Sequence, residues 1–322
     1  MKNLFLIFFF VAAISADGFS QRKDFFVTME DSIVKLHYSI ISEHNSIIRN
    51  QKNEDLLLLI EETLRAKNSM AYSFDAIKTI SVLTSKDKKV RVFTWFLTDD
   101  QNTHIYYGFL QTYSETEKEY RLFPLTDKWG KINNPEAQML TPTNWYGAYY
   151  TEIIETESST KKYYTLLGWN GGDIFSQCKL IEVLYISPKG VPSFGARIFQ
   201  KYPNGRTLRV IFRYAKNSHF ILRYDNQHYT KRSEKKDKKT NRYTTDTIPS
   251  GMIVFSQLIP MDESVQSVPQ LMVGEASLND AFIEKNGVWV FQPDVIVRNP
   301  IQNTEKREPK KVTPRRFYSP NK

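Results

Sequence analysis

Cysteine is nearly missing from this chain, since Cys178 is the only one in 322 residues. A single thiol allows no disulfide within the chain, so stability must come from the size of the hydrophobic core. The Asn-x-Ser/Thr sequence that marks N-glycosylation does not occur either.

Motifs of known catalytic chemistry are also missing. The sequence has no nucleophile elbow, no His-Glu-x-x-His, no phosphate-binding loop and no Cys-x-x-Cys. We therefore assign no catalytic residue, no metal ligand and no cofactor, and we lean against an enzyme. The alternative left open is a hydrolase that uses scattered Asp and Glu residues, which a single sequence does not reveal.

The apolar run near the start is short, covering Leu4–Ile14. Lys2 precedes it, and small residues follow at Ser15, Ala16, Gly18 and Ser20, which is the order of a secretory signal peptide. A bilayer span needs roughly 20 residues, so a membrane anchor is the weaker alternative, as is a first buried helix. We expect residues 1–20 to be a signal peptide and the protein to be exported by a bacterium, to the periplasm or the medium, without a transmembrane segment.

Basic residues are concentrated in two segments. Lys231–Arg242 and Gln302–Lys322 each hold seven Lys or Arg and two acidic residues, whereas the whole chain has a net charge of +9. Runs of like charge are typical of solvated, mobile segments, and we expect residues 301–322 to be a disordered tail. The alternative is that both segments bind an anionic envelope polymer; we do not expect nucleic-acid binding, because the rest of the chain is not basic.

Two helices are predicted before residue 76. Met29, Ile33, Leu36 and Ile40 recur at helical spacing in a helix from Asp24 to about Ile48. Asn50–Asn53 then predicts a break, with Asn53 as the N-cap of a second, leucine-rich helix that ends near Lys67. Residues 21–75 would form a helical hairpin that must dock on the following domain.

Aromatic residues make up 14% of the chain and favour strands. Alternating patterns such as Val90–Thr98 and His104–Tyr113 recur up to about residue 300, separated by turn residues and without room for helices. The fold class predicted is α+β, mainly β: an N-terminal helical hairpin packed on a large antiparallel β-meander domain over residues 76–300. Sandwich, barrel and propeller-like arrangements all remain open.

One predicted hairpin joins Arg206–Tyr214 to His219–Tyr224. Keeping the apolar faces together pairs Tyr214 with Phe220 and places Arg209 opposite Asp225.

Polar clusters have simple structural interpretations. His37 and His44 are seven residues apart on one predicted helix, so we expect a surface or seam pair rather than two metal ligands. Asp99, Asp100, Asn102 and His104 could surround a cation, but a hairpin turn favours the same residue types, and we expect the turn.

Two aromatic turns are the candidate binding sites. Trp169 is followed by Asn170, Gly171, Gly172 and Asp173, a combination that can cradle a sugar or a peptide. Trp145 and Tyr146 form a second, exposed aromatic candidate. The alternative for each tryptophan is that it simply fills the core under a turn.

A resemblance follows from three segments, Asn144–Tyr150, Tyr163–Asn170 and Asp294–Asn299. They resemble a family of uncharacterised exported bacterial proteins with no assigned activity. The resemblance implies no catalytic role for any residue. We therefore expect an exported, soluble, non-catalytic module that binds or scaffolds in the envelope, with a hydrolase of envelope glycans as the alternative.

Overall fold

The computed structural model describes residues 24–236, 240, 243–264 and 268–295. The predicted signal peptide, the basic tail and part of the basic run Lys231–Arg242 lie outside these residues. Within the described part of the chain, no helix is long and apolar enough to span a membrane.

The two N-terminal helices form the predicted hairpin, with a different break. The first helix covers residues 24–41, and α2 covers Ser46–Arg65. Asn45 is the N-cap, because its side chain accepts hydrogen bonds from the backbone N–H groups of Ile47 and Ile48. Predicting Asn53 as the N-cap was wrong: Asn53 is buried inside α2, where its Oδ1 accepts a hydrogen bond of 2.8 Å from the Trp95 indole.

The strands form three sheets. The first has the order β1-β2-β3-β4; the second has β10-β7-β6-β5, with β8 beside β7; the third has β11-β12-β13-β14-β9. All pairings are antiparallel except β9 with β14. The strands are β1 Ser81–Thr84, β2 Val90–Thr98, β3 His104–Ser114, β4 Glu119–Thr126, β5 Tyr149–Glu157, β6 Lys162–Asn170, β7 Ser176–Ile186, β8 Pro192–Phe194, β9 Phe199–Gln200, β10 Val210–Ala215, β11 Leu222–Lys236, β12 Tyr243–Pro260, β13 Met272–Lys285 and β14 Val288–Gln292. Short 3-10 helices cover Ser69–Ala71, Pro135–Ala137 and Pro269–Leu271.

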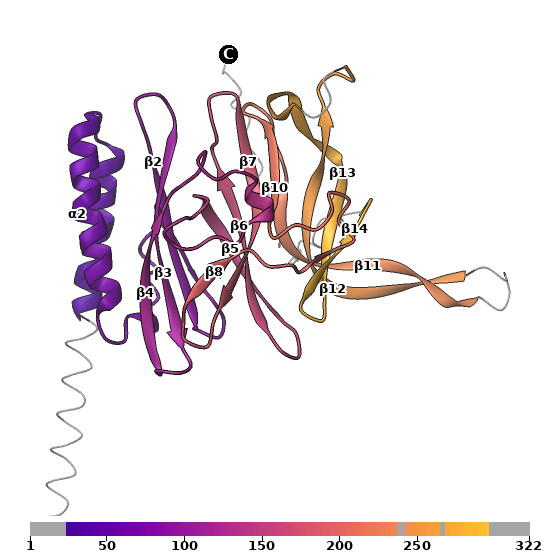
Figure 1. Cartoon of the computed structure of the whole chain (residues 1–322), viewed down its shortest axis with the longest axis horizontal. Helices are drawn as coiled ribbons and strands as arrows, with labels where there is room; N and C mark the ends of the chain where they lie inside the picture. The colour runs from indigo at the N-terminus through magenta and orange to yellow at the C-terminus, as the bar shows by residue number, and fades with distance from the viewer. Residues whose placement is uncertain (1–23, 237–239, 241–242, 265–267, 296–322) are drawn as a thin grey trace, which may run out of the picture.

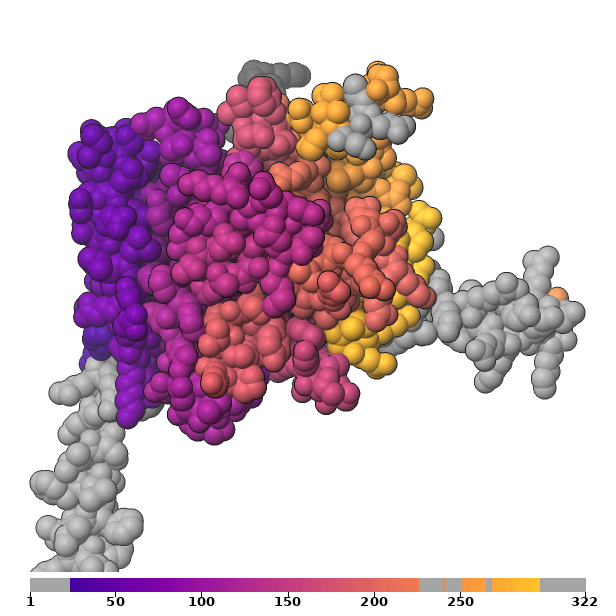
Figure 2. Space-filling view, in the orientation of Figure 1, coloured from indigo at the N-terminus to yellow at the C-terminus, as the bar shows by residue number. Residues whose placement is uncertain are grey.

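The helices and the three sheets stack as successive layers, from α2 at the left of Figure 1 to β13 and β14 at the right. In the space-filling view the layers pack against one another as a continuous body (Figure 2). The predicted α+β, mainly β fold is confirmed, and the sheets do not close into a barrel.

Each interface between layers has its own hydrophobic cluster. Ile33 and Leu56 of the helices pack with Phe93 of the first sheet. The first and second sheets share a second cluster, and the second and third sheets share a third. Along β6, even-numbered Leu166 joins the second cluster and odd-numbered Leu167 the third, because successive side chains of a strand point to opposite faces. The middle sheet is therefore buried on both faces.

The predicted hairpin between Arg206–Tyr214 and His219–Tyr224 was wrong. β10 pairs with β7 in the second sheet, whereas β11 pairs with β12 in the third. The rings of Tyr214 and Phe220 do stack, with centroids 5.3 Å apart, but they meet between two layers rather than across a ladder. Arg209 is fully buried and pairs with Glu182 at 2.8 Å instead of lying opposite Asp225.

The basic run Lys231–Arg242, which the sequence predicts to be a solvated and mobile segment, lies partly in a strand. Residues 231–236 belong to β11, where Lys231 is the ladder partner of Asp246 and Lys236 that of Tyr243. Figure 1 shows this β11–β12 hairpin projecting from the body.

Candidate functional site

Trp145 and Tyr146 are core residues. The Trp145 side chain is fully buried and donates a hydrogen bond of 2.9 Å from its indole nitrogen to the Tyr150 hydroxyl. Tyr146 is 1% exposed and accepts a hydrogen bond from Arg213. The prediction of an exposed aromatic pair was therefore wrong, and the alternative of core-filling side chains holds at these two positions.

Asn170 and Asp173 build the turn after β6. The Asn170 side chain is buried; its amide donates to the Gly147 carbonyl at 2.6 Å and its Oδ1 accepts from the Gly172 N–H. Asn170 thereby joins the two turns that the sequence singled out. Asp173 is exposed, and its Oδ1 accepts from the backbone N–H groups of Phe175 and Ser176. Partial burial raises the pKa of the Asp173 carboxyl, but these hydrogen bonds outweigh it and hold the pKa below its usual value.

Trp169 differs from Trp145 because it is only half-buried and borders a pocket of about 370 Å³. We call this cavity the Trp169 pocket. It lies at one end of β6, β7 and β10 of the second sheet, where the chain leaves β10 to cross to β11. Its walls come from β6, β7, β10 and that crossing segment, and they consist of Trp169, Gln177, Lys179, Tyr214, Lys216, Asn217, Ser218, His219 and Phe220.

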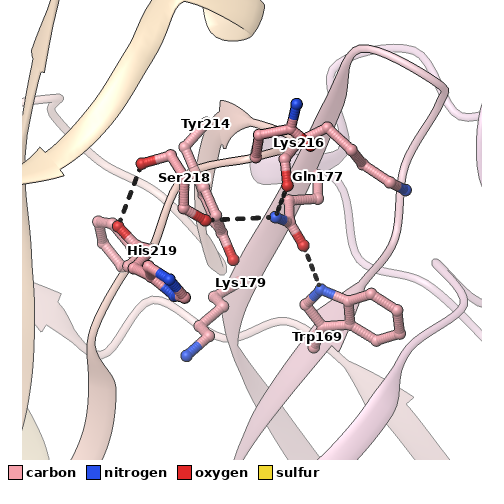
Figure 3. Close-up of a pocket in the computed structure, with 9 residues that line it drawn as sticks. Trp169, Gln177, Lys179, Tyr214, Lys216, Ser218 and His219 are labelled. Carbon is pink, nitrogen blue, oxygen red and sulfur yellow. Dashed lines mark hydrogen bonds between the residues drawn. The ribbon is translucent and has the colours of Figure 1, made fainter.

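Gln177 fixes the indole in place (Figure 3). Its side-chain oxygen accepts a hydrogen bond of 2.8 Å from the Trp169 nitrogen. Its amide nitrogen donates to the carbonyls of Lys216 and Ser218, at 2.6 and 3.5 Å. One side chain therefore ties the indole to the crossing segment, so the aromatic wall is ordered before any ligand arrives.

A second layer of side chains supports the indole from the first sheet. The rings of Phe96 and His104 lie 5.4 and 5.2 Å from the Trp169 ring. His104 is the first residue of β3 and follows the turn that begins at Asp99. The Asp99 side chain accepts hydrogen bonds from the backbone N–H groups of Gln101 and Thr103. Burial, and then the nearby Lys216 charge, lower the pKa of His104.

The polar groups on the wall of the Trp169 pocket are mainly cationic or neutral. Lys216 donates from its Nζ to the Gly171 carbonyl at 2.5 Å. The half-buried Lys179 ammonium makes no hydrogen bond or ion pair with any residue that the structure describes, and burial lowers its pKa. No Asp or Glu in the described part of the chain lines the pocket.

A second pocket, of about 590 Å³, lies at the other end of β6 and β7. The rings of Tyr163 and Tyr185 face it 5.8 Å apart, and the Lys161 ammonium lies 5.6 Å over the Tyr185 ring. Its remaining lining residues include Met139 and Arg197, and no described carboxylate is among them. The hydrophobic cluster between the second and third sheets, which contains Leu167 and Ile181, separates the two pockets.

Metal binding finds no support among the residues that the structure describes, where no three His, Cys, Asp or Glu side chains gather. His37 is buried beside Thr79, whereas His44 is exposed. Cys178 is buried, and burial raises the pKa of its thiol to about 11.

Sequence reasoning found Trp169 but missed the rest of the pocket wall. Gln177, Lys179 and Tyr214 lie within the alternating strands β7 and β10, and no motif marks them. Only the ladder register, in which Lys179 is the partner of Trp169 and Gln177 that of Tyr214, brings them together.

No family model matches the chain, and no curated protein or solved structure is significantly similar to it. The resemblance drawn from Asn144–Tyr150, Tyr163–Asn170 and Asp294–Asn299 therefore stays a prediction.

Proposed function

We propose that this chain is an exported, non-catalytic module that binds or scaffolds in the bacterial envelope, and that the Trp169 pocket is its ligand-binding site. The observation that carries the proposal is a rigidly held, half-buried indole in the same pocket as the Lys179 ammonium, which has no partner among the described residues. Binding sites combine such an apolar surface with a few directed polar groups. The pocket volume of about 370 Å³ is suited to one or two sugar rings or a short peptide segment.

The hydrolase alternative receives less support. Glycoside hydrolysis generally uses two carboxyl groups roughly 5–10 Å apart on either side of the scissile bond. Among the residues that the structure describes, no Asp or Glu lines either the Trp169 pocket or the Tyr163–Tyr185 pocket. A binding function therefore fits both pockets better than glycan cleavage.

Export and envelope attachment complete the proposal. The charged start, the apolar run Leu4–Ile14 and the small residues after it support cleavage and export. The basic segments Lys231–Arg242 and Gln302–Lys322 would add contacts to an anionic envelope polymer through the release of its counterions.

The function is tested with Trp169→Ala against a panel of soluble oligosaccharides and short peptides, by isothermal titration calorimetry. We expect the wild type to bind at least one member of the panel and the variant to lose that binding. The variant should unfold with a smaller loss of stability than the roughly 3–5 kcal/mol typical of a fully buried tryptophan.

Tyr163→Ala is the matched control, because Tyr163 is another half-buried aromatic residue on the same strand that lines the other pocket. This variant should bind the panel as the wild type does. Binding that survives Trp169→Ala would show that the Trp169 pocket is not the site.

A further inference from the structure

Lys179 is the group of the Trp169 pocket whose charge is least compensated. The only cause acting on its pKa is burial, which disfavours the ammonium form, and no carboxylate offsets it. Lys216, by contrast, donates to the Gly171 carbonyl and interacts with Asp173. A half-buried cation without an anionic partner is a cost to the free protein. An anionic ligand that entered the pocket would remove that cost.

Trp169 and Lys179 are adjacent on one face of the middle sheet. They are Cα partners in the β6–β7 ladder, and directly opposite residues of an antiparallel pair have their Cβ atoms about 4.5–5.5 Å apart. Both side chains line the Trp169 pocket, so a ligand that fills it contacts the indole and the Lys179 side chain together. The required ligand has a flat apolar face and an anionic group at its rim.

The other polar groups of the wall are suited to hydroxyl groups. The Tyr214 hydroxyl has no hydrogen-bond partner among the described residues, and the side chains of Asn217 and His219 are exposed at the pocket. These groups can each exchange hydrogen bonds with the hydroxyls of a sugar. The Gln177 side chain is less available to a ligand, because it already makes hydrogen bonds with the Trp169 indole and with the carbonyls of Lys216 and Ser218.

We propose that the Trp169 pocket selects an acidic sugar, the uronate unit of an anionic polysaccharide, and that Lys179 binds its carboxylate while Trp169 packs against the apolar face of the ring. A uronate joins in one ring the three features that the wall matches: an apolar C–H face, a rim carboxylate and several hydroxyls. This inference rests on the proposed function, because it names the ligand class of the same pocket.

The test is calorimetric titration of the full chain with di- and trigalacturonate and, in parallel, with the neutral galactose oligomers of equal length. We expect the acidic oligomers to bind more tightly, with a preference that shrinks as salt is raised. Lys179→Met should weaken the acidic oligomers by about 10- to 100-fold, as expected for a lost charge-assisted hydrogen bond, and should leave the neutral ones unchanged.

Two further variants control the experiment. Lys179→Arg keeps the positive charge and should retain most of the preference for acidic oligomers. Lys86→Met makes the same charge change at an exposed turn of the first sheet and should bind both series as the wild type does. Thermal unfolding of Lys179→Met, compared with Lys179→Arg, checks that the pocket remains folded.

The outcomes separate this inference from the proposed function. Equal binding of acidic and neutral oligomers that is lost in Trp169→Ala would overturn the uronate proposal and leave the binding function standing. Tighter binding of a phosphorylated sugar or of a peptide carboxylate would overturn it in the same way. If Trp169→Ala abolishes no binding of any probe, both proposals are wrong.

Discussion

His37 gives the sharpest prediction about stability. It lies on the first helix, is 3% exposed, and its Nδ1 is 2.6 Å from the Thr79 hydroxyl oxygen. Its Nε2 is buried without a hydrogen-bond partner among the described residues. The ring is therefore held neutral in the seam between the helical hairpin and the segment that leads into β1. Protonation would place an unpaired charge there.

The size of the effect follows from the pKa of His37, which burial lowers from 6.5 to about 4. In the unfolded chain the ring takes up a proton near pH 6.5, whereas in the folded protein it does so only near pH 4. Above pH 6.5 the ring is neutral in both states, and the free energy of unfolding is at its full value. As the pH falls from 6.5 toward 4, the unfolded chain takes up a proton that the folded protein does not, so the free energy of unfolding decreases. At 1.36 kcal/mol per pKa unit, the loss between pH 7.5 and 4.5 is roughly 2–3 kcal/mol.

The measurement is urea unfolding of the wild type, His37→Gln and His44→Gln at several pH values between 7.5 and 4.5. His104 also titrates at a lowered pKa, so the comparison between variants isolates the contribution of His37. We expect His37→Gln to lose about 2–3 kcal/mol less than the wild type over this range. His44 is exposed on the turn after the same helix, and His44→Gln should follow the wild type. A wild-type pH dependence in His37→Gln would refute the reasoning.

Two further predictions concern the core and the chain start. Glu182→Leu should cost about 3–5 kcal/mol in chemical unfolding, because it leaves the fully buried Arg209 without its anion. The double variant Glu182→Leu/Arg209→Met should recover part of that loss, and a cost below about 1 kcal/mol for the single variant would contradict the assignment of the pair. Intact-mass measurement of secreted protein should give a first residue between Ala16 and Gln21, and a chain that keeps Met1 would refute export by a cleaved leader.

Local patterns determined the elements of this protein well. The predicted strand Val90–Thr98 coincides with β2, and the expected turn begins at Asp99 and ends before His104, the first residue of β3. Period-two alternation is a property of the strand itself, so it is visible in the sequence wherever a strand has distinct faces. The helical hairpin was predicted for the same reason, since its apolar spacing is local.

The break within that hairpin shows where local reasoning failed. Asn45 and Asn53 are both suitable N-cap residues, and nothing nearby in the sequence distinguishes them. The difference comes from Trp95, which is 42 residues from Asn53 and gives its side chain a buried hydrogen-bond partner. A distant donor therefore decided which asparagine caps the helix.

The sequence by itself determined the strands, the helices and the concentration of positive charge, because propensity, periodicity and charge runs act over a few neighbouring residues. Tertiary structure alone decided that β10 and β11 enter different sheets, that Arg209 meets Glu182, and that Trp145 is buried while Trp169 borders a pocket. These outcomes depend on which apolar faces bury each other across layers. That choice minimises the exposed apolar surface of the whole chain, and no short segment contains it.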